Sequence, residues 1–469
     1  LHFNDPGVDD HKTLVYAEFV VPLLKSSAKK VLPDLALYLE NTIYNSYLYQ
    51  KDSQEFFAKN VRLWVKDLER MGQIIASKLP YPPTPPSSKK SDKTLISFFF
   101  HNESMLAHII HITSIVSNYN KSNNNKFKFK AYFLSGHNNE MRDYFKNLGI
   151  EVFNLNEHYP QGSLSTQLIN LKQEIAKDKT KTLIWGCLGS FMPFTFGMRV
   201  APHQAWVSVK YKGITINSID HYLQFHLSGA SQKINKTKWL SFTGIFDFHS
   251  SPKEYEEGKK IRSHYSNHSI LLGTFARESI IRDEIFLNAV VKILIKNPNC
   301  GYLWTGRNRD NYIQKYFEKN GVSDQTYFIG WVNINIYATV IDIFLDTFSF
   351  MCGHNLFRTM AANKASISFQ KERNSLTTPQ NHQIVINMSN NLYGSDRNKV
   401  LSKKLIEKYS THFISYSYEE YIEKANKLIN DDEVRHKCST ANREIINNFF
   451  HNPENPIELT LNNLEYICK

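Results

Sequence analysis

Two arginines that follow an apolar run give the clearest sign of chemistry in this chain. Residues 270–273 are apolar, and Arg277 and Arg282 come after them, five positions apart. Guanidinium groups bind phosphate oxygens through paired hydrogen bonds and neutralise the charge that grows on a departing diphosphate. The pair could therefore clamp a diphosphate, but the motif taken alone is explained more simply by two solvated surface arginines.

A second signal is a turn that opens a predicted helix. Gly353, His354 and Asn355 follow an apolar run and precede a helical pattern that contains Arg358. The first N–H groups of a helix have no intrahelical partner and carry positive dipole charge, so they suit phosphate oxygens. Such turns are common, so this one indicates a phosphate site only in combination with Arg277 and Arg282.

Short apolar runs that alternate with amphipathic helices surround these residues, which is typical of βαβ units and a parallel sheet. We expect strands in a first series at residues 95–100, 131–134, 152–155 and 183–185, and in a second at 270–273, 301–305, 326–329, 343–346 and 365–369. The predicted fold class is thus α/β, with two Rossmann-like domains facing a cleft. Open α/β sheets bind ligands at the carboxyl ends of their strands.

Composition divides the chain of 469 residues further. Residues 1–79 read as an N-terminal all-helical region, and residues 80–93 as a proline-rich linker because proline removes backbone donors. We expect an acceptor-side Rossmann-like domain at 94–250 and a donor-side domain with C-terminal helices at 251–469. The nearly uncharged stretch 182–198 contains glycines and a proline, so we predict buried strand, loop and helix start there, not a membrane span.

The ordered motifs of the second series resemble the donor-binding half of GT-B glycosyltransferases. The resemblance implies that Arg277 and Arg282 meet the diphosphate, Arg282 in place of the usual lysine, and that the nucleobase lies against Gly330 and Trp331. Arg358 stands where the family usually has an acidic residue that holds the ribose, and a guanidinium offers only donors. Gly353, His354 and Asn355 match the donor turn.

Residues 194–222 are similar to a narrower group. Arg199, Ala201, Pro202 and Gln204, followed by Ile219-Asp220, match a motif of the protein O-GlcNAc transferases and the bacterial cytoplasmic asparagine glycosyltransferases that modify adhesins. These are inverting, metal-independent enzymes that use UDP-sugars. The resemblance therefore implies a nucleotide sugar as co-substrate, no further cofactor, and a protein acceptor, with a glycan or a lipid-linked acceptor as the alternative.

Four residues are candidates for acceptor activation. His101, Glu103 and His108 lie at the first predicted strand-to-helix turn, where a base would face the cleft. Helix capping with solvated histidines is the alternative there. Lys210 falls where the resembling enzymes carry a functional His or Tyr, and a basic role would require a lowered pKa.

We expect no metal site. Asp342 and Asp346 flank an apolar strand, but strand-end capping explains their spacing better than metal binding. Five dispersed cysteines show no CxxC spacing, which argues against a zinc site or a disulfide framework and favours a cytoplasmic location.

Charge leaves several partner classes open. The net charge of +12 favours anionic partners, and peripheral membrane contact is compatible with it. No basic-aromatic ribbon is present, so we expect no nucleic-acid partner. The competing hypothesis is a catalytically inactive GT-B-like binding or scaffold protein, suggested by Arg358.

Overall fold

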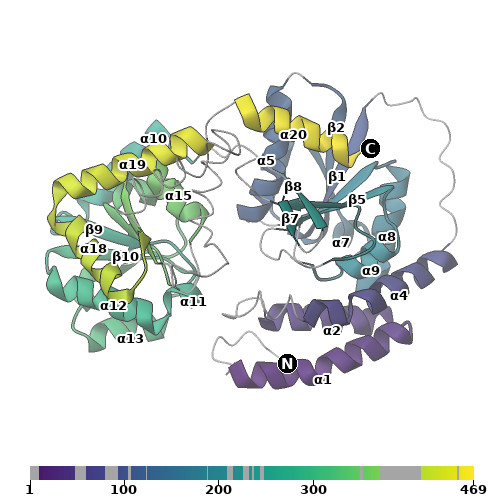
Figure 1. Ribbon diagram of the computed structural model, residues 1–469, viewed down its shortest axis with the longest axis horizontal. Coiled ribbons are helices and arrows are strands. Elements are labelled where there is room, and N and C mark those ends of the chain that lie inside the picture. The colour runs from purple at the N-terminus through teal and green to yellow at the C-terminus, as the bar shows by residue number, and fades with distance from the viewer. Residues whose placement is uncertain are drawn as a thin grey trace. The chain divides into compact units, whose positions relative to one another are not determined.

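The computed structural model describes residues 10–47, 60–79, 93–103, 107–122, 124–186, 189–208, 215–224, 232–234, 237–242, 248–348, 352–369, 414–450 and 454–469. The chain divides into two compact units, Leu1–Ile245 with Pro453–Lys469, and Phe246–Asn452. Both units are α/β, as the sequence predicts, and a helical N-terminal region precedes the first sheet (Figure 1). The predicted linker, 80–93, lies outside the described residues except for its last position.

The first unit begins with helices and continues as alternating strands and helices. Its elements are α1 (Asp10–Lys29), α2 (Pro33–Tyr47), η1 (Val61–Leu63), α4 (Val65–Lys78), β1 (Thr94–Glu103), α5 (Ala107–Lys121), β2 (Phe127–Gly136), α6 (Asn139–Asn147), β3 (Ile150–Asn154), α7 (Leu155–His158), α8 (Leu164–Lys177), β4 (Thr182–Trp185), α9 (Met192–Gly197), β5 (His203–Ser208), β6 (His221–Gln224), β7 (Gln232–Ile234), β8 (Thr237–Ser241) and α20 (Glu454–Ile467). The described residues of the stretch 182–198 form β4, part of a loop and α9, which confirms the prediction of strand, loop and helix start.

The first sheet has the order β3-β2-β1-β4-β5-β6-β8-β7, and only the β7–β8 pair among its described strands is antiparallel. Its faces follow the two-residue period of a strand. On β1, Ile96, Phe98 and Phe100 pack into a core with α5 and α6, whereas Phe99 packs on the opposite face with α8, α9 and the N-terminal helices. A parallel sheet buried on both faces explains why its strands are apolar runs.

The N-terminal helices are part of the first unit. At Gly72 in α4, an added Cβ would lie 2.2 Å from the carbonyl oxygen of Phe194 in α9, and at Gly197 it would lie 2.4 Å from that of Glu69. The backbones of α4 and α9 therefore touch where both lack a side chain. The carboxylate of Glu69 also accepts hydrogen bonds from the N–H and hydroxyl of Ser218, at 2.8 and 2.7 Å.

The last helix corrects one prediction. The sequence places all C-terminal helices with the second domain, but α20 packs on α5 and adds Leu464 and Ile467 to the core of the first unit. The hydroxyl of Thr182 donates to the carbonyl of Ile467 at 2.9 Å. Because an amphipathic helix can cover either sheet, its sequence alone does not specify which one.

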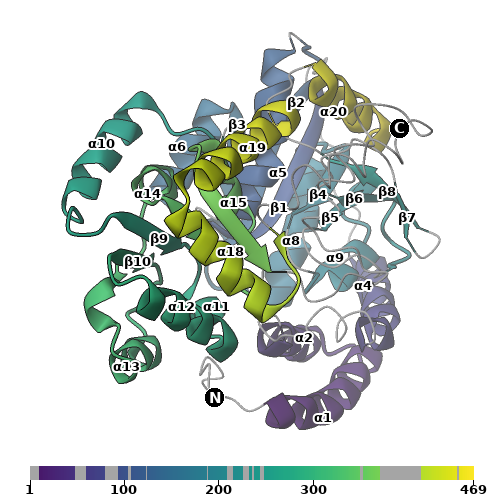
Figure 2. The same ribbon diagram turned by 60° about the vertical axis from the view of Figure 1, so that its left-hand side comes forward.

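The described strands of the second unit form a six-stranded parallel sheet with the order β11-β10-β9-β12-β13-β14. Its elements are α10 (Pro252–Ser263), β9 (Ile270–Thr274), α11 (Glu278–Ile281), α12 (Glu284–Lys296), β10 (Cys300–Trp304), α13 (Asn311–Lys319), η2 (Ser323–Gln325), β11 (Thr326–Phe328), α14 (Ile334–Val340), β12 (Ile343–Leu345), α15 (His354–Ala361), β13 (Ala365–Phe369), β14 (Ile414–Ser415), α18 (Tyr418–Asn430) and α19 (Asp432–Phe450). Helices α18 and α19 contact β13, and Figure 2 shows them in front of this sheet.

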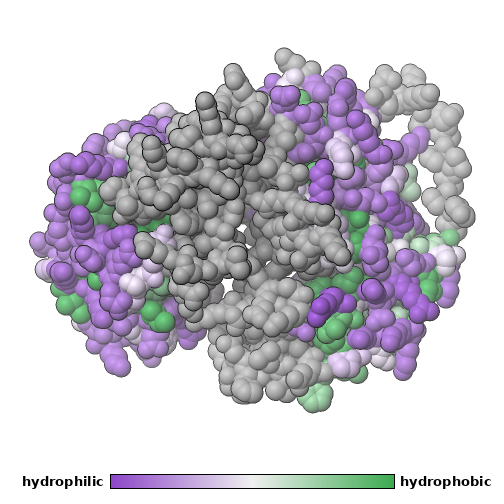
Figure 3. All heavy atoms as spheres, in the orientation of Figure 1, coloured by the Kyte–Doolittle hydropathy of each residue, from purple (hydrophilic) through white to green (hydrophobic). Residues whose placement is uncertain are grey.

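On the described parts of the face in Figure 3 the surface is mostly hydrophilic, and hydrophobic residues form small groups within it. The apolar side chains instead form the cores around the sheets. Among the described residues, no helix combines the length and the apolar character needed to cross a membrane.

Candidate functional site

Each sheet has one place where the direction of winding reverses. In the first, the chain moves from β1 outward to β2 and β3 and returns to β4 on the other side of β1; in the second, β9 and β12 are the corresponding neighbours. The loops that leave two such strands diverge and open a crevice at the carboxyl edge, where α/β proteins bind ligands. Residues that follow β1, β4, β9 and β12 are therefore the first to consider.

In the second unit, β9 leads directly to Arg277. The N–H of Ala276 donates to the hydroxyl of Thr305 at 2.9 Å, and that hydroxyl donates to the carbonyl of Ala276 at 2.8 Å. This exchange fixes the loop after β9 against the loop after β10. Arg277 then begins α11 as its N-cap residue and is partly exposed at the edge.

The loop after β11 adds an exposed aromatic ring. Trp331 is 66% exposed and follows Gly330, whose φ of 73° lies in the left-handed region. The guanidinium of Arg307 lies 5.7 Å from the centre of the Trp331 ring. An exposed indole held by a cation at the carboxyl edge has the shape and polarity to stack on a nucleobase.

The glycine turn follows β12. Gly353 has φ 46° and ψ −108°, a conformation that glycine adopts far more readily than other residues, and no described atom lies within 4 Å of where its Cβ would be. Asp346 anchors the approach to this turn by accepting the N–H of Cys352 at 2.8 Å and the hydroxyl of Ser368 at 2.9 Å. Burial raises the pKa of Asp346 to about 6, although these hydrogen bonds oppose the shift.

The turn is joined to the loop after β9. The side-chain N–H of Asn355 donates to the carbonyl of Phe275 at 2.6 Å, so the two loops at the switch point are held together. His354 packs edge-on against Phe248, with ring centres 5.6 Å apart. Burial, aided by the positive charge of Arg358, lowers the pKa of His354 to about 4, so its imidazole is neutral at pH 7.

Two of the predicted donor-site cations make contacts within the protein. The guanidinium of Arg282 lies over the ring of Tyr312 in α13, 4.8 Å from its centre. Arg358 donates a hydrogen bond to the side-chain oxygen of Asn335 in α14, and the amide of Asn335 in turn donates to Glu254 at 3.2 Å. Arg358 thus braces α15 against α14, and its guanidinium is not a substitute for an acceptor of ribose hydroxyls.

The structure thus brings together Arg277, Gly330, Trp331 and the turn of Gly353, His354 and Asn355 at one edge of the second sheet. Sequence reasoning missed Arg307. It follows β10 as Arg277 follows β9, so its place after a predicted strand was a usable signal. It also missed Glu278, whose carboxylate accepts the N–H of Arg307 at 2.9 Å and fixes that loop.

In the first unit, His101 lies at the end of β1. Its ring packs against Phe191, 5.1 Å away between centres, and against Trp185 at 5.6 Å, and it forms a hydrogen bond with the backbone of Ser190. Burial lowers the pKa of His101 to about 4, and the charge of His108 acts in the same direction. A base works best with a pKa near the working pH, so His101 is better suited to orient a ligand than to take its proton.

Glu103 has a structural role. Its carboxylate accepts two hydrogen bonds from Arg142, at 2.5 and 2.8 Å, and others from Asn154 and the N–H of Asn138. Burial raises the pKa of Glu103, but these hydrogen bonds outweigh it and leave the pKa below its usual value. An ionised, fully engaged carboxylate is a poor base, so these contacts do not favour Glu103 as the group that takes the acceptor's proton.

His108 lies in the first turn of α5, close enough for its charge to act on His101. Lys210, the fourth candidate, lies outside the described residues.

The motif at residues 199–220 is a polar brace. Arg199 pairs with Asp220 at 2.8 Å and donates to the carbonyl of Pro202 at 2.6 Å. The amide of Gln204 donates to the carbonyls of Phe196 and Ser218, and its oxygen accepts the N–H of Val200. These contacts lock α9 to β5 and to the segment before β6.

Acidic groups that resemble metal ligands are also engaged. Asp342 accepts the N–H of Leu271 at 2.8 Å and pairs with Arg262 at 3.4 Å, so it braces β9 against β12. With the contacts of Asp346, this confirms the capping interpretation. Glu103, His137 and Glu157 place ligand atoms within 4.8 Å of one another, but the guanidinium of Arg142 donates to both carboxylates and already supplies a cation there.

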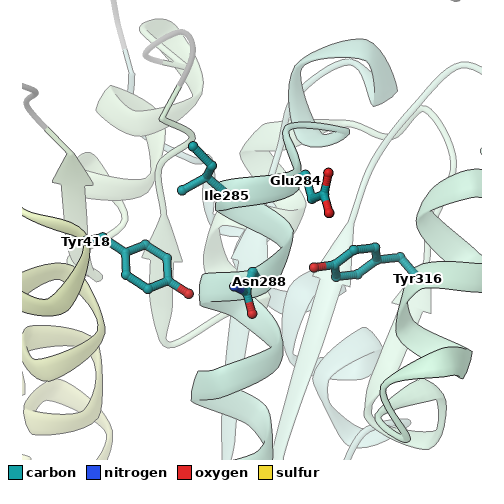
Figure 4. Close-up of a pocket in the computed structure, with 5 residues that line it drawn as sticks. All are labelled: Glu284, Ile285, Asn288, Tyr316 and Tyr418. Atoms are coloured by element: carbon teal, nitrogen blue, oxygen red, sulfur yellow. The ribbon is translucent and has the colours of Figure 1, made fainter.

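A shallow pocket of about 320 Å³ lies elsewhere in the second unit, between α12, α13 and the start of α18. Glu284, Ile285, Asn288, Tyr316 and Tyr418 line it, and Figure 4 shows Tyr316 and Tyr418 directed toward α12 from opposite sides. The residues gathered at the carboxyl edge do not line this pocket. It offers no arginine and no glycine turn, so we do not assign the donor to it.

Comparison with solved structures places the fold. The chain superposes on an O-GlcNAc transferase of Thermobaculum terrenum with a TM-score of 0.57 and 13% identity over 96% of this chain and 82% of that one. Anabaena HepE, solved with UDP-glucose, gives 0.56 and 11% identity over 79% of this chain and 99% of that one. The pneumococcal O-GlcNAc transferase GtfA, solved with UDP and GlcNAc, gives a TM-score of 0.51 and 9% identity over 80% of this chain and 99% of that one.

No protein-family model and no curated protein sequence matches the chain. The structural matches share two Rossmann-like units and show that this chain has the GT-B fold, which confirms the predicted fold class. A match that covers 96% of the chain must include most of the N-terminal helices, whereas the other two leave out about a fifth.

Proposed function

We propose that the protein is a glycosyltransferase that moves a sugar from a UDP-sugar to a protein acceptor, with inversion at the anomeric carbon and without a metal ion. The observation that carries this proposal is the carboxyl edge of the second sheet, where Arg277, Trp331 and the turn at Gly353 lie on neighbouring loops of a GT-B fold. HepE and GtfA, which share the fold, were solved with UDP-glucose and with UDP and GlcNAc.

Each donor-side group has a distinct task in this proposal. The exposed ring of Trp331 stacks on the base, and Arg277 binds the diphosphate. The first N–H groups of α15 add dipole charge beside it. As the bond from the sugar to the diphosphate breaks, negative charge grows on the leaving oxygen, and a fixed guanidinium stabilises that charge without reorganisation.

In this proposal the acceptor binds at the carboxyl edge of the first sheet. There the neutral imidazole of His101 orients the attacking group by hydrogen bonding, and His108 is our candidate for accepting its proton. The proton passes to the base while the nucleophile attacks the anomeric carbon opposite the leaving diphosphate, which gives inversion.

A protein acceptor is supported by the N-terminal helices. They are packed into the first unit through α4 and α9, and the match that includes them is to an O-GlcNAc transferase. A lipid-linked or polysaccharide acceptor is the alternative. Transfer of labelled sugar to a protein extract, and its loss on protease treatment of the product, distinguishes the two.

A catalytically inactive GT-B-like binding or scaffold protein is the second candidate function. It is favoured by Arg358, which replaces the usual acidic residue and is bound to Asn335. Calorimetric titration of the wild type with UDP, GDP, ADP and CMP separates the possibilities, because absence of nucleotide binding excludes the donor site and leaves a scaffold role.

The decisive experiment is a donor screen by release of free nucleotide, with wild type and Arg277→Ala. We expect turnover with a UDP-sugar and a loss of at least about 100-fold in Arg277→Ala, the size expected for removing one oxyanion donor. Arg443→Ala, which removes an exposed arginine from α19, is the matched control. Undiminished turnover in Arg277→Ala would remove Arg277 from the donor site.

A further inference from the structure

The N-terminal helices reach the switch point of the first sheet. The loop at residues 189–191 follows β4 and faces the end of β1. An added Cβ at Gly189 would lie 2.6 Å from the hydroxyl of Tyr44 in α2. Beside it, Glu40 of α2 is completely buried, and its carboxylate accepts the N–H of Phe191 at 2.8 Å. Two side chains of α2 therefore fix this loop.

Phe191 has an unusual backbone. Its φ of 65° and ψ of −16° are left-handed, and such a conformation in a bulky residue persists only where its surroundings impose it. Its carbonyl accepts hydrogen bonds from the N–H and the hydroxyl of Thr195, at 2.9 and 2.8 Å. Its N–H is bound by Glu40, so a residue far away in the sequence holds one side of the strained peptide.

The same loop sets the place of His101. The ring of Phe191 packs against the imidazole, and the backbone of Ser190, one residue earlier, forms a hydrogen bond with it. A rotation of the 190–191 peptide moves both contacts together. Glu40 does not itself approach a ligand in this arrangement; it acts through the loop.

We propose that Glu40 is a positioning residue of the acceptor side, which holds the loop at residues 189–191 and, through it, the imidazole of His101. This inference rests on the proposed function, because it takes the carboxyl edge of the first sheet as the acceptor's place. It gives the N-terminal helices a task in building that edge.

Matched substitutions test it. Glu40→Gln keeps an oxygen that accepts the N–H of Phe191, whereas Glu40→Leu keeps the volume and loses the acceptor. The control is Glu69→Leu, because Glu69 is also a buried glutamate of the N-terminal helices but binds Ser218, not the loop at 189–191. Melting temperatures identify the variants that fold, and all further measurements are made below the lowest of them.

The first readout is spectroscopic and needs no substrate. In protein labelled at histidine Cε1, the signal of His101 is assigned by its loss in His101→Asn. We expect the pKa of His101 to remain near 4 in wild type, Glu40→Gln and Glu69→Leu, and to rise by at least one unit in Glu40→Leu as the ring is released. If His101 has the same pKa in Glu40→Leu and in Glu69→Leu, the proposal is overturned, whatever the activity of the protein. If Glu40→Leu does not fold, a shifted signal in Glu40→Gln overturns it instead.

The second readout is kinetic. Because a small misplacement of a catalytic constellation costs up to about 100-fold, we expect kcat to fall at least tenfold in Glu40→Leu with an unchanged KM for the donor, and to return to within about threefold of wild type in Glu40→Gln. A matching fall of kcat in Glu69→Leu contradicts a positioning role. Absence of turnover in wild type, together with the expected titration, refutes the proposed function and leaves the structural part of the inference standing.

Discussion

The carboxyl edges of the two sheets have the same topology but are built differently. In the first unit, Arg142 binds Glu103 internally at this edge, and Asp220 binds Arg199 in the same way at the opposite edge, before β5 and β6. In the second, the edge carries a 66% exposed Trp331 and a Gly353 turn with open space around it. The motif at residues 199–220, which was the most specific one in the sequence, is a structural brace. The arginine and glycine-turn motifs, which were weak when taken alone, lie at the open edge of the second sheet.

The strongest test of this contrast replaces one arginine in each unit, Arg277 at the open edge and Arg199 in the brace, by alanine. Arg277→Ala is expected to lower turnover by at least about 100-fold with little change in stability. Arg199→Ala removes an ion pair that is almost half exposed and two hydrogen bonds to carbonyls, so we expect a loss of about 1 kcal/mol in the free energy of unfolding. The affinity for UDP, measured by calorimetry, should stay within about twofold in Arg199→Ala. Unchanged turnover in Arg277→Ala together with a large loss of UDP affinity in Arg199→Ala would show that the brace belongs to the donor site.

The buried Glu40 makes the stability of the first unit depend on pH. Burial raises its pKa to about 8 from 4.5, partly offset by the N–H of Phe191 and by Trp64. Between pH 4.5 and about 8, Glu40 is ionised in the unfolded chain but keeps its proton in the folded protein. The free energy of unfolding therefore falls as the pH rises through this range.

Glu40→Gln cannot ionise, and its stability relative to wild type should therefore rise by about 1 kcal/mol per pH unit from pH 5 to 7.5. Denaturant unfolding of both proteins at several pH values measures this. If the difference in the free energy of unfolding between Glu40→Gln and wild type does not change with pH, Glu40 is ionised in the folded protein.

The glycine turn of the second edge should respond in affinity more than in stability. Alanine at Gly353 meets no described atom, so its cost comes from the backbone conformation, on the order of 1–3 kcal/mol. Relief of that strain turns the peptide at the start of α15, and we expect UDP to bind about tenfold more weakly.

Gly321→Ala is the control, since Gly321 also has a positive φ, 70°, with no described atom near its Cβ position, but lies after α13. We expect it to lose stability and keep its affinity for UDP. An equal loss of affinity in both variants would mean that the effect is general strain and not the turn.

The sequence predicted the sheets better than the contacts at their edges. Apolar runs of strand length and turn residues are local signals, so the strands around Arg277 follow from them. The pairing of Glu103 with Arg142 joins residues 39 apart, and Glu40 reaches Phe191 across 151 positions. Contacts between residues so far apart in the sequence depend on the tertiary fold, and no local sequence pattern predicts them. For the same reason the sequence did not show that α20 returns to the first unit.

The smallest predicted effect concerns Trp331, and it tests whether the open edge binds a base. The ring is mostly exposed and lies beside Arg307, so its removal should change the free energy of unfolding by less than about 0.5 kcal/mol. Loss of base stacking costs about 1 kcal/mol, which corresponds to a roughly fivefold weaker binding of UDP.

Trp331→Phe keeps a stacking face and should recover most of that affinity. Tyr466→Ala removes another exposed ring, from α20 of the first unit, and should not affect UDP binding. Ribose 5-phosphate, which has no base, should bind wild type and Trp331→Ala equally. A difference there would show that Trp331 supports the loop at Arg307 and does not stack on a base, and the contrast between the two edges would then rest on Arg277 and the glycine turn alone.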